Sequence, residues 1–287
     1  MAERIYINPE LSDNFTSIND IYQALEITNP RLSGFTQLNS RPVYVKSSSP
    51  IPFNRRLKNA FRSMGPWRSA PRTREFRNLL KLRERGLPAV RPLVAAERRV
   101  FGFLERQLLI TERILDSASL FDIAVQGNLE PDQLFSINRR LGRLVGRMHN
   151  AGFCHGDLFM RNILVAKNGA EPSFHFIDCH QGRWNRLPGR ACAYDLGCYE
   201  KWAATLYDEK TRGHFFAGYL EARPGENLEK LLRLANRARE RLIIRRQKRK
   251  RKRHQEKQHL DPTLHPAPLD PALISRLLNS PCNEGRT

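Results

Sequence analysis

The amino-acid sequence predicts an α+β protein with two lobes: a small, β-rich N-terminal lobe with one key helix and a larger, mainly helical C-terminal lobe. The strand pattern is clearest at Pro42–Lys46, where β-branched valines alternate with other residues. The helix pattern is clearest at Pro71–Arg85 and in long segments after Ser119, whose apolar residues recur every three or four positions. With 287 residues, 40% of them hydrophobic, the chain can bury the core of one large or two small domains.

The N-terminal lobe, expected at 1–113, combines strands with a single amphipathic helix. After Pro42–Lys46, the segments Leu93–Ala96 and Gly102–Ile114 also have an extended pattern. The helix Pro71–Arg85 is followed by Gly86-Leu87-Pro88, a combination that ends helices.

The C-terminal lobe is expected at 114–240 and is mainly helical. Its predicted elements are Asp132–Asn150, the short strands Ile163–Val165 and Phe174–Ile177, and the helices Ala191–Leu206 and Asn227–Arg245. The two strands are expected to form a hairpin because Lys167-Asn168-Gly169 lies between them. Residues 241–287 are expected to form a basic helix extension and a Pro-containing tail.

Several protein classes do not fit this sequence. No stretch approaches the roughly 18 consecutive apolar residues that span a membrane, and the N-terminus lacks the apolar run of a secretory signal. Five cysteines without a CxxC pair argue against a disulfide framework and against a zinc site. We therefore expect a cytoplasmic protein in which His149, His175 and His180 are core or loop residues.

The chain is strongly basic, with 49 Lys and Arg against 29 Asp and Glu and a formal net charge of +20. Ten of these basic residues lie in the eighteen-residue run Arg241–Gln258. Three interpretations of the run stay open: a solvated helix extension, docking of Arg241–Lys257 on an anionic membrane surface, or binding to nucleic acid. The third is not favoured, because no aromatic side chains interleave with the charges to stack on bases.

The most informative segment is Gly152–Val165, which lies between a predicted helix and a predicted strand. His155, Asp157 and Asn162 follow the order H-x-D-L-x-x-x-N, the spacing of the catalytic loop in the protein-kinase superfamily. Phosphoryl transfer needs a carboxylate that positions the attacking hydroxyl and accepts its proton, and an oxygen ligand for Mg²⁺. Asp157 and Asn162 would supply these groups; the competing interpretation is a surface loop with a helix-capping Asp.

A second acidic residue follows the predicted hairpin. The apolar run Phe174–Ile177 ends in Asp178, the place from which kinase-like sites bring a second carboxylate to the metal. The residues after Asp178 are CHQGR rather than Phe-Gly, so the usual DFG motif is absent. Asp178 could otherwise simply end a strand.

A kinase-like site also needs a Lys on a strand and a helical Glu that orients it. Lys46 ends the strand PVYVK, and Glu75 lies in the first turn of the helix that follows. Glu84 is the other acidic residue of this helix, but it lies beside the Gly86 stop and is expected to face solvent.

Taken together, these segments resemble the lipopolysaccharide kinase family, the Kdo and heptose kinases of the protein-kinase-like superfamily. The resemblance extends from Lys46 to about Gly197, roughly half of the chain. The motifs that carry it are VYVK, TREFRNLLKLRERGLPAVRPL, LGRLVGRMHNAGFCHGDLFMRNIL, FHFIDCHQGR and RACAYDLG.

The resemblance implies a bilobal protein-kinase-like fold and an ATP- and Mg²⁺-dependent kinase. Its acceptor would be a sugar hydroxyl of the lipid A–core glycolipid, at the cytoplasmic face of the inner membrane. It assigns phosphate binding to Lys46, orientation of that Lys to Glu75, and catalysis to Asp157. Asn162 and Asp178 would hold Mg²⁺. It further implies that Asp195 is a buried carboxylate that accepts N–H groups of the catalytic loop, although an N-cap or helix-surface Asp is the alternative.

Two departures from kinase motifs stand out. Before Lys46 the only glycine of a possible phosphate-binding loop is Gly34, in RLSGFTQLNSRP. Many protein kinases carry a Lys two residues after the catalytic Asp, where this chain has Phe159, so the nearest cation is Arg161. Arg161 could stabilise the transferring phosphoryl group or pair with an acid.

Adenine recognition in such a fold usually comes from backbone groups of the segment that joins the lobes. The segment Leu108–Ile114 is the candidate, with Glu112 and Ile114 at the adenine edge.

Two other functions remain open from the sequence. One is a phosphotransferase of the same fold that acts on a protein or another small molecule, such as an aminoglycoside. The other is a non-catalytic, kinase-like scaffold bound through its basic segment. Lys46, Asp157, Asn162 and Asp178 argue against the scaffold, and the poor glycine loop argues for it.

Overall fold

The computed structural model describes residues 2–11, 15–25, 33–48, 69–167, 171–185, 189–253, 262 and 269–280. The chain divides into two compact units, Met1–Leu115 with Phe176–Gln181, and Asp116–His175 with Gly182–Thr287. The segment Phe176–Gln181, which carries Asp178, therefore groups with unit 1, whereas we predicted it within the C-terminal lobe. Each unit is described by itself.

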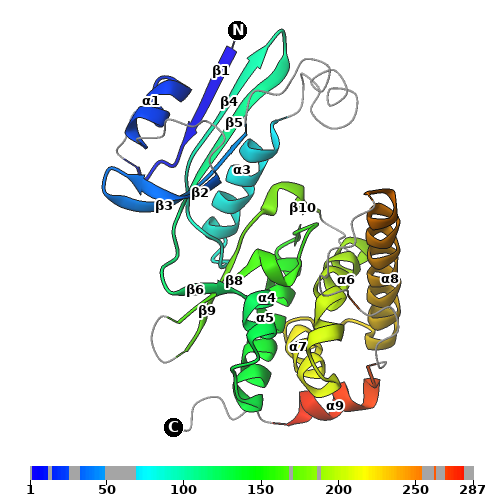
Figure 1. Cartoon of the computed structure of the whole chain (residues 1–287). Coiled ribbons are helices and arrows are strands. Elements are labelled where there is room, and N and C mark those ends of the chain that lie inside the picture. The colour runs from blue at the N-terminus through cyan, green and yellow to red at the C-terminus, as the bar shows by residue number, and fades with distance from the viewer. Residues whose placement is uncertain are drawn as a thin grey trace. The chain divides into compact units, whose positions relative to one another are not determined.

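Unit 1 is built on a five-stranded antiparallel sheet with the strand order β1-β4-β5-β3-β2 (Figure 1). The strands are β1 Ala2–Ile7, β2 Ser33–Leu38, β3 Arg41–Ser48, β4 Pro92–Val100 and β5 Phe103–Glu112. Its helices are α1 Ile18–Ala24 and α3 Pro71–Glu84, and the one-turn helix η2 spans Cys179–Gln181.

The two faces of this sheet are covered by different helices, because residues alternate between the faces of a strand. On one face Val43 and Val45 join Ile18 and Ile21 of α1 in a buried cluster. On the other face Leu109 packs with Phe76 of α3. Lys46 is paired with Leu109 in the register of β3 and β5, so the alternation places its side chain on the α3 face.

A buried carboxylate anchors the beginning of α3 to β4, an interior strand of the sheet. Glu97, 1% exposed, accepts hydrogen bonds from the backbone N–H of Ala70 at 3.0 Å and from the Thr73 hydroxyl at 2.9 Å. Arg99 donates to the other Glu97 oxygen at 3.0 Å. The carboxylate thus satisfies donors at the positive end of the helix, where Pro71 occupies the first turn.

The connection before Lys46 is a tight hairpin rather than a glycine loop. Asn39 and Ser40 form the turn between β2 and β3, with φ values of 48° and 64°. Positive φ at both central residues matches the twist of a two-residue hairpin. Gly34, which we expected in a loop over the phosphates, instead pairs with Val45 inside β2.

Unit 2 is mainly helical. Its helices are α4 Leu120–Gln126, α5 Pro131–Asn150, α6 Gly189–Leu206, α7 Glu209–Ala222, α8 Leu228–Arg253 and α9 Pro271–Asn279. Its short strands and one-turn helix are β6 Ser117–Ser119, β7 Phe153–Cys154, η1 Met160–Asn162, β8 Ile163–Ala166, β9 Ser173–Phe176, whose last residue belongs to unit 1, and β10 Arg183–Trp184. Figure 1 shows α5 beside α7 and α6 beside α8, pairs that are also in direct contact.

Glycines allow these helix pairs to approach closely. A Cβ atom at Gly218 of α7 would lie 1.9 Å from the backbone oxygen of Arg139, and one at Gly142 of α5 would lie 2.0 Å from that of Phe215. At Gly197 of α6 a Cβ would lie 2.8 Å from the Ala235 oxygen of α8. Only a residue without a side chain fits at such crossings.

The predicted elements around the motifs are present, and the missed ones have specific causes. β8 and β9 are neighbours in one sheet, as the predicted hairpin requires, but its turn at 168–170 lies outside the described residues. The helix α7 was missed because all residues from Thr211 to Leu220 are buried, which removes the polar face that marks a surface helix. The helix α8 runs without a break through position 241, from which we predicted a basic extension of the same helix.

Among the helices of the described ranges, none combines the length and apolar character needed to cross a bilayer.

Candidate active site

The H-x-D-L-x-x-x-N motif lies in a loop that strands and helices of unit 2 hold in place. The strand β7 leads into it, Gly156 turns the backbone with φ 74°, and η1 closes it before β8 begins. Backbone bonds within the loop join Phe159 N–H to the Asp157 carbonyl at 2.7 Å and Asn162 N–H to the Phe159 carbonyl at 2.8 Å. The loop is therefore tightly folded, with Asp157 and Asn162 at its two ends.

Asp195 of α6 holds this loop in place. Its carboxylate is fully buried and accepts the backbone N–H groups of His155 at 2.6 Å and Gly156 at 2.8 Å. This is the arrangement that the resemblance implied, and it replaces the alternative of an N-cap or helix-surface Asp. The carboxylate fixes the two peptide groups directly before Asp157.

Asn162 connects back to Asp157 through its side-chain amide. Its Nδ2 donates to the Asp157 backbone carbonyl at 2.8 Å and to Asp157 Oδ2 at 3.0 Å. Arg161 Nη2 lies 3.4 Å from the same Oδ2, but the Arg161 side chain is 52% exposed. The structure thus brings Asp157, Arg161 and Asn162 together, and Arg161 pairs with the acid.

Lys46, Glu75 and Asp178 form a second group within unit 1. Lys46 Nζ lies 2.6 Å from Glu75 Oε1 and 3.5 Å from Asp178 Oδ1. Glu75 lies in the second turn of α3 and is 1% exposed, whereas Glu84 at the end of the helix is exposed. A buried carboxylate that holds an ammonium in this way gives Lys46 a single orientation.

Two further residues, which the motif analysis did not identify, contact Asp178. Arg72 Nη1 lies 2.8 Å from Glu75 Oε2 and 3.6 Å from Asp178 Oδ1, and His180 Nδ1 lies 3.1 Å from Asp178 Oδ1. Burial alone would raise the pKa of Asp178, but the His180 bond and the charges of Lys46 and Arg72 lower it well below its usual range. Asp178 is therefore ionised at neutral pH. Both residues lie near predicted site residues in the sequence, Arg72 one helical turn before Glu75 and His180 two residues after Asp178.

The backbone at Asp178 is itself unusual, because φ is 59°, in the left-handed region that few non-glycine residues adopt. The neighbouring residue is held by α3: Asn78 Nδ2 donates to the Cys179 carbonyl at 2.8 Å. The same helix that carries Glu75 thus also fixes the segment that carries Asp178.

Glu112 and Ile114 lie at the end of β5 and beyond it. The Glu112 N–H donates to the Arg91 carbonyl at 2.8 Å, so this N–H is already used. The structure does not bring either residue into contact with Lys46, Glu75 or Asp178 through any bond among the described residues. Their role in adenine binding stays a prediction.

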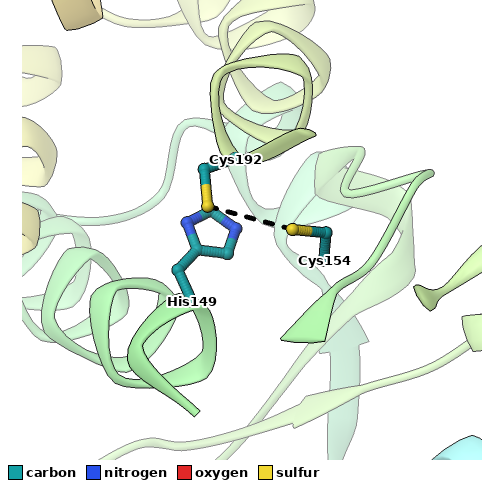
Figure 2. Close-up of side chains that lie close together, drawn as sticks. All are labelled: His149, Cys154 and Cys192. Carbon is teal, nitrogen blue, oxygen red and sulfur yellow. Dashed lines mark hydrogen bonds between the residues drawn. The ribbon is translucent and has the colours of Figure 1, made fainter. Parts of the chain in front are cut away.

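A buried group of possible metal-ligand side chains comes from α5, β7 and α6 (Figure 2). His149 lies in the last turn of α5, Cys154 precedes the loop and Cys192 belongs to α6, and one donor atom from each lies within 4.8 Å of the others. The two sulfur atoms are 3.8 Å apart. Both His149 nitrogens also have hydrogen-bond partners, Tyr219 Oη at 3.0 Å and Asp195 Oδ2 at 3.2 Å.

These contacts change the ionisation of the group. Burial by itself would lower the pKa of His149, but bonds to Asp195 and Cys192 outweigh it and raise that pKa to about 9. The hydrogen bond from Cys154 lowers the pKa of Cys192 to about 5, against the opposing effect of burial. Through its two ring nitrogens, His149 of α5 is bonded to Tyr219 of α7 and to Asp195 of α6 and so links the three helices.

Three comparisons place the chain among known proteins. The family model described as "Lipopolysaccharide kinase (Kdo/WaaP) family" matches residues 53–215, more than half of the chain. A 3-deoxy-D-manno-octulosonic acid kinase of Stenotrophomonas maltophilia strain R551-3 is 43% identical over 107 residues, 36% of this chain and 40% of the relative. The kinase of the same name from Pasteurella multocida strain Pm70 is 33% identical over 129 residues, 45% of this chain and 47% of the relative. The chain thus covers less than half the length of these curated relatives.

The comparison of structures concerns the fold. The solved structure "WaaP in complex with acyl carrier protein" matches with a TM-score of 0.57 and 17% sequence identity, over 88% of this chain and 100% of that chain. The predicted α+β, protein-kinase-like fold is thereby confirmed.

Proposed function

Because the chain belongs to the lipopolysaccharide kinase (Kdo/WaaP) family, we propose that it is an ATP- and Mg²⁺-dependent kinase. Its acceptor is a sugar hydroxyl, on Kdo or heptose, of the lipopolysaccharide inner core. The relatives that support this acceptor are named 3-deoxy-D-manno-octulosonic acid kinases.

The observation that carries the proposal is the anchored loop with Asp157 and Asn162. A general base must hold the attacking hydroxyl within hydrogen-bond distance, and a carboxylate on a rigid loop meets that requirement. Asp157 accepts the proton of the sugar hydroxyl as its oxygen attacks the γ-phosphorus and the bond to the β-phosphate oxygen breaks. Asp195 and Asn162 keep the Asp157 carboxylate in one orientation through the bonds described above.

The second group supports the binding of the triphosphate. Lys46, oriented by Glu75, supplies a charge-assisted hydrogen bond to phosphate oxygens. Arg72 adds a second cation beside it, so that the charge of Asp178 is balanced before any ligand binds.

The donor atoms fit Mg²⁺, which prefers oxygen ligands. Asp178 offers an ionised carboxylate. Asn162 bonds to Asp157 through its nitrogen, and among the described residues its amide oxygen has no hydrogen-bond partner. When bound, the ion would neutralise charge on the phosphate oxygens.

The decisive experiment offers the purified protein, with Mg²⁺ and γ-labelled ATP, four acceptors in parallel: lipid A–Kdo, heptosylated core, a basic protein and an aminoglycoside. Label in a glycolipid, absent in an Asp157→Asn control, supports the proposal. Label only in protein or aminoglycoside would assign the chain to another phosphotransferase class, and ATP binding without transfer would indicate a scaffold.

We further propose that the basic run Arg241–Lys257 docks the enzyme on the anionic cytoplasmic face of the inner membrane. Supporting this, α8 continues to Arg253, so most of the run extends a helix that packs on α6. Each basic residue near such a surface contributes about 1 kcal/mol. Residues 254–257 lie outside the described ranges. Nucleic acid remains the disfavoured partner.

The test of docking removes charge and not chain, because any truncation within the run would also remove α9, which contacts α7 and whose Ile274 is fully buried. Arg246 is kept, because its guanidinium lies 5.2 Å from the centre of the Trp202 ring. A variant with Gln at each of the five basic positions 249–253 should lose binding to anionic vesicles yet keep turnover on a soluble acceptor; equal vesicle binding by the two forms would overturn the docking proposal.

A further inference from the structure

An unpaired cation is buried beside the catalytic loop. Lys201 of α6 is 6% exposed, and among the described residues its ammonium has neither an ion pair nor a hydrogen-bond acceptor. It lies over two aromatic rings instead, 4.7 Å from the centre of Phe159 and 5.7 Å from that of Trp202. Cation–π contacts recover part of the lost hydration, but they do not neutralise a charge.

Two more cations share these rings. The guanidinium of Arg161 lies 4.5 Å from the centre of Phe159, and that of Arg246 lies 5.2 Å from the centre of Trp202. Three cations from the loop, α6 and α8 are thus gathered around two rings of unit 2. Asp157 borders this group, because Arg161 lies 3.4 Å from its carboxylate.

This arrangement is electrostatically costly without a ligand. Burial, followed by the charges of Arg246 and Arg161, lowers the pKa of Lys201 to about 8, and the opposing effect of Asp157 does not cancel this shift. A buried ammonium that its surroundings compensate only in part is typical of functional sites, and an anionic ligand would supply the missing charge. The cluster therefore carries the positive charge that binds an anionic group.

The location of the cations relates them to the reacting groups. Phe159 stands two residues after Asp157, where many protein kinases carry a Lys on the loop itself, and Lys201 reaches the same ring from another helix. Arg246 belongs to α8, which begins after residue 215, the end of the segment that matches the family model. This part of the cluster is therefore supplied by a helix outside the family segment.

We propose that Lys201, Arg161 and Arg246 form a subsite for an anionic oxygen group, carboxylate or phosphate, next to Asp157. This inference rests on the proposed function, in which Asp157 is the base of phosphoryl transfer, and it adds a binding subsite to that function. The group can come from the acceptor, as the carboxylate of a sugar acid, or from the nucleotide, as the phosphoryl group in transfer. Both are recognised by the same chemistry of charge-assisted hydrogen bonds.

Binding measured without turnover tests the subsite. Calorimetry on the full-length protein compares free 3-deoxy-D-manno-octulosonate with its uncharged methyl ester, and a non-hydrolysable ATP analogue with ADP, both with Mg²⁺. The variants are Lys201→Met and Arg246→Gln. Matched controls are Lys230→Met and Arg237→Gln, which remove the same charges from exposed positions of α8.

We expect Lys201→Met to weaken the binding of at least one anion about tenfold or more, the loss typical of one charge-assisted bond. Arg246→Gln should weaken the same ligand, and the two controls should not. Selective loss of the sugar acid, with the ester unaffected, assigns the subsite to the acceptor. Selective loss of the ATP analogue, with ADP unaffected, assigns it to the transferring phosphoryl group.

Two results would overturn the subsite: equal binding by wild type and Lys201→Met, or no binding of any of these anions by the wild type. Its failure is separable from that of the kinase proposal, because a protein that transfers no phosphate can still show anion binding that depends on Lys201. Thermal unfolding adds an independent readout. If Lys201 serves only the fold, Lys201→Met should lower Tm; if it awaits an anion, removing the unpaired charge should leave Tm unchanged or raise it.

Discussion

Asn78 of α3 donates a hydrogen bond from its side-chain amide to the backbone carbonyl of Cys179 at 2.8 Å, and this bond is buried. It ties the residue after Asp178 to the helix that also carries Glu75. The contacts that Lys46 makes with two carboxylates therefore depend on one helix, α3.

We expect Asn78→Leu to raise the Mg²⁺ concentration needed for phosphoryl transfer, with a smaller effect on the affinity for ATP. The substitution leaves the Cys179 carbonyl without this donor, at a cost of about 1–3 kcal/mol, and frees the segment that carries Asp178. Titration of activity with Mg²⁺ measures the effect. Arg77→Gln, on the exposed face of the same helix, is the control, and an unchanged Mg²⁺ requirement in Asn78→Leu would contradict the positioning role.

Asp157→Asn and Asp178→Asn should each reduce turnover by roughly 10²-fold or more, because each keeps the shape of the side chain and removes its charge. Both variants should fold, since Asn is among the residues that best tolerate the positive φ found at Asp178. Turnover and Tm are measured together. Near-native turnover with native melting in either variant would remove that residue from the site.

Lys46→Met should weaken ATP binding, whereas Glu75→Gln should have a milder effect through the same step. The structure adds that Glu75 keeps a partner when Lys46 is lost, because Arg72 lies 2.8 Å from its other oxygen. The Lys46→Met variant should therefore retain most of its stability. Nucleotide titration and melting measure the two effects, and normal ATP affinity in Lys46→Met would place the phosphate-binding cation elsewhere. The next Lys along the chain, Lys58, would then be the candidate, and it lies outside the described residues.

Gly218→Ala should destabilise the protein by about 1–3 kcal/mol or more, because its methyl group would overlap the Arg139 carbonyl where α5 and α7 cross. Gly189→Ala is the matched control, since nothing lies within 4 Å of a Cβ at that position of α6. Chemical denaturation of both variants gives the difference. Equal free energies of unfolding for the two variants would show that the crossing of α5 and α7 accommodates a methyl group without loss of stability.

Stability should fall in acid through His214 of α7. Burial, assisted by Arg139 and Lys210, lowers its pKa to about 4, so the folded protein holds the neutral ring, stacked 4.6 Å from Phe135. The unfolded chain takes up a proton below about pH 6.5, so the contribution is complete above that pH and is lost progressively toward pH 4. His214→Asn should show a flatter decline of Tm between pH 6.5 and 4; parallel curves would assign the acid sensitivity to other groups.

Features that lie within one segment of the chain could be predicted from the sequence, whereas contacts between distant segments could not. The helix α3 and the strand β3 follow from patterns within single segments, and the kinase-like loop follows from the spacing of three residues. Arg72 and Asn78 reach the Asp178 segment only through tertiary packing, whereas His180 belongs to that segment itself. No periodicity records such contacts.

The cations around Phe159 illustrate the same limit. Arg161 could be identified from the sequence, because it is the cation nearest to the loop along the chain. Lys201 lies far from the loop in the sequence, and only the packing of α6 brings its ammonium over the same ring. Spacing rules therefore could not have found it.

The anchoring of α3 by Glu97 has a consequence for regulation. In protein kinases, activity is often switched by moving the helix that carries the Glu partner of the phosphate-binding Lys. Here the start of that helix is bonded to β4 through Ala70 and Thr73, and an outward movement would break both of these bonds to a buried carboxylate. A hydrogen bond to a charged group contributes about 1.5–3 kcal/mol. A helix secured in this way favours an enzyme that is permanently assembled, with its output set by the supply of substrate rather than by a switch.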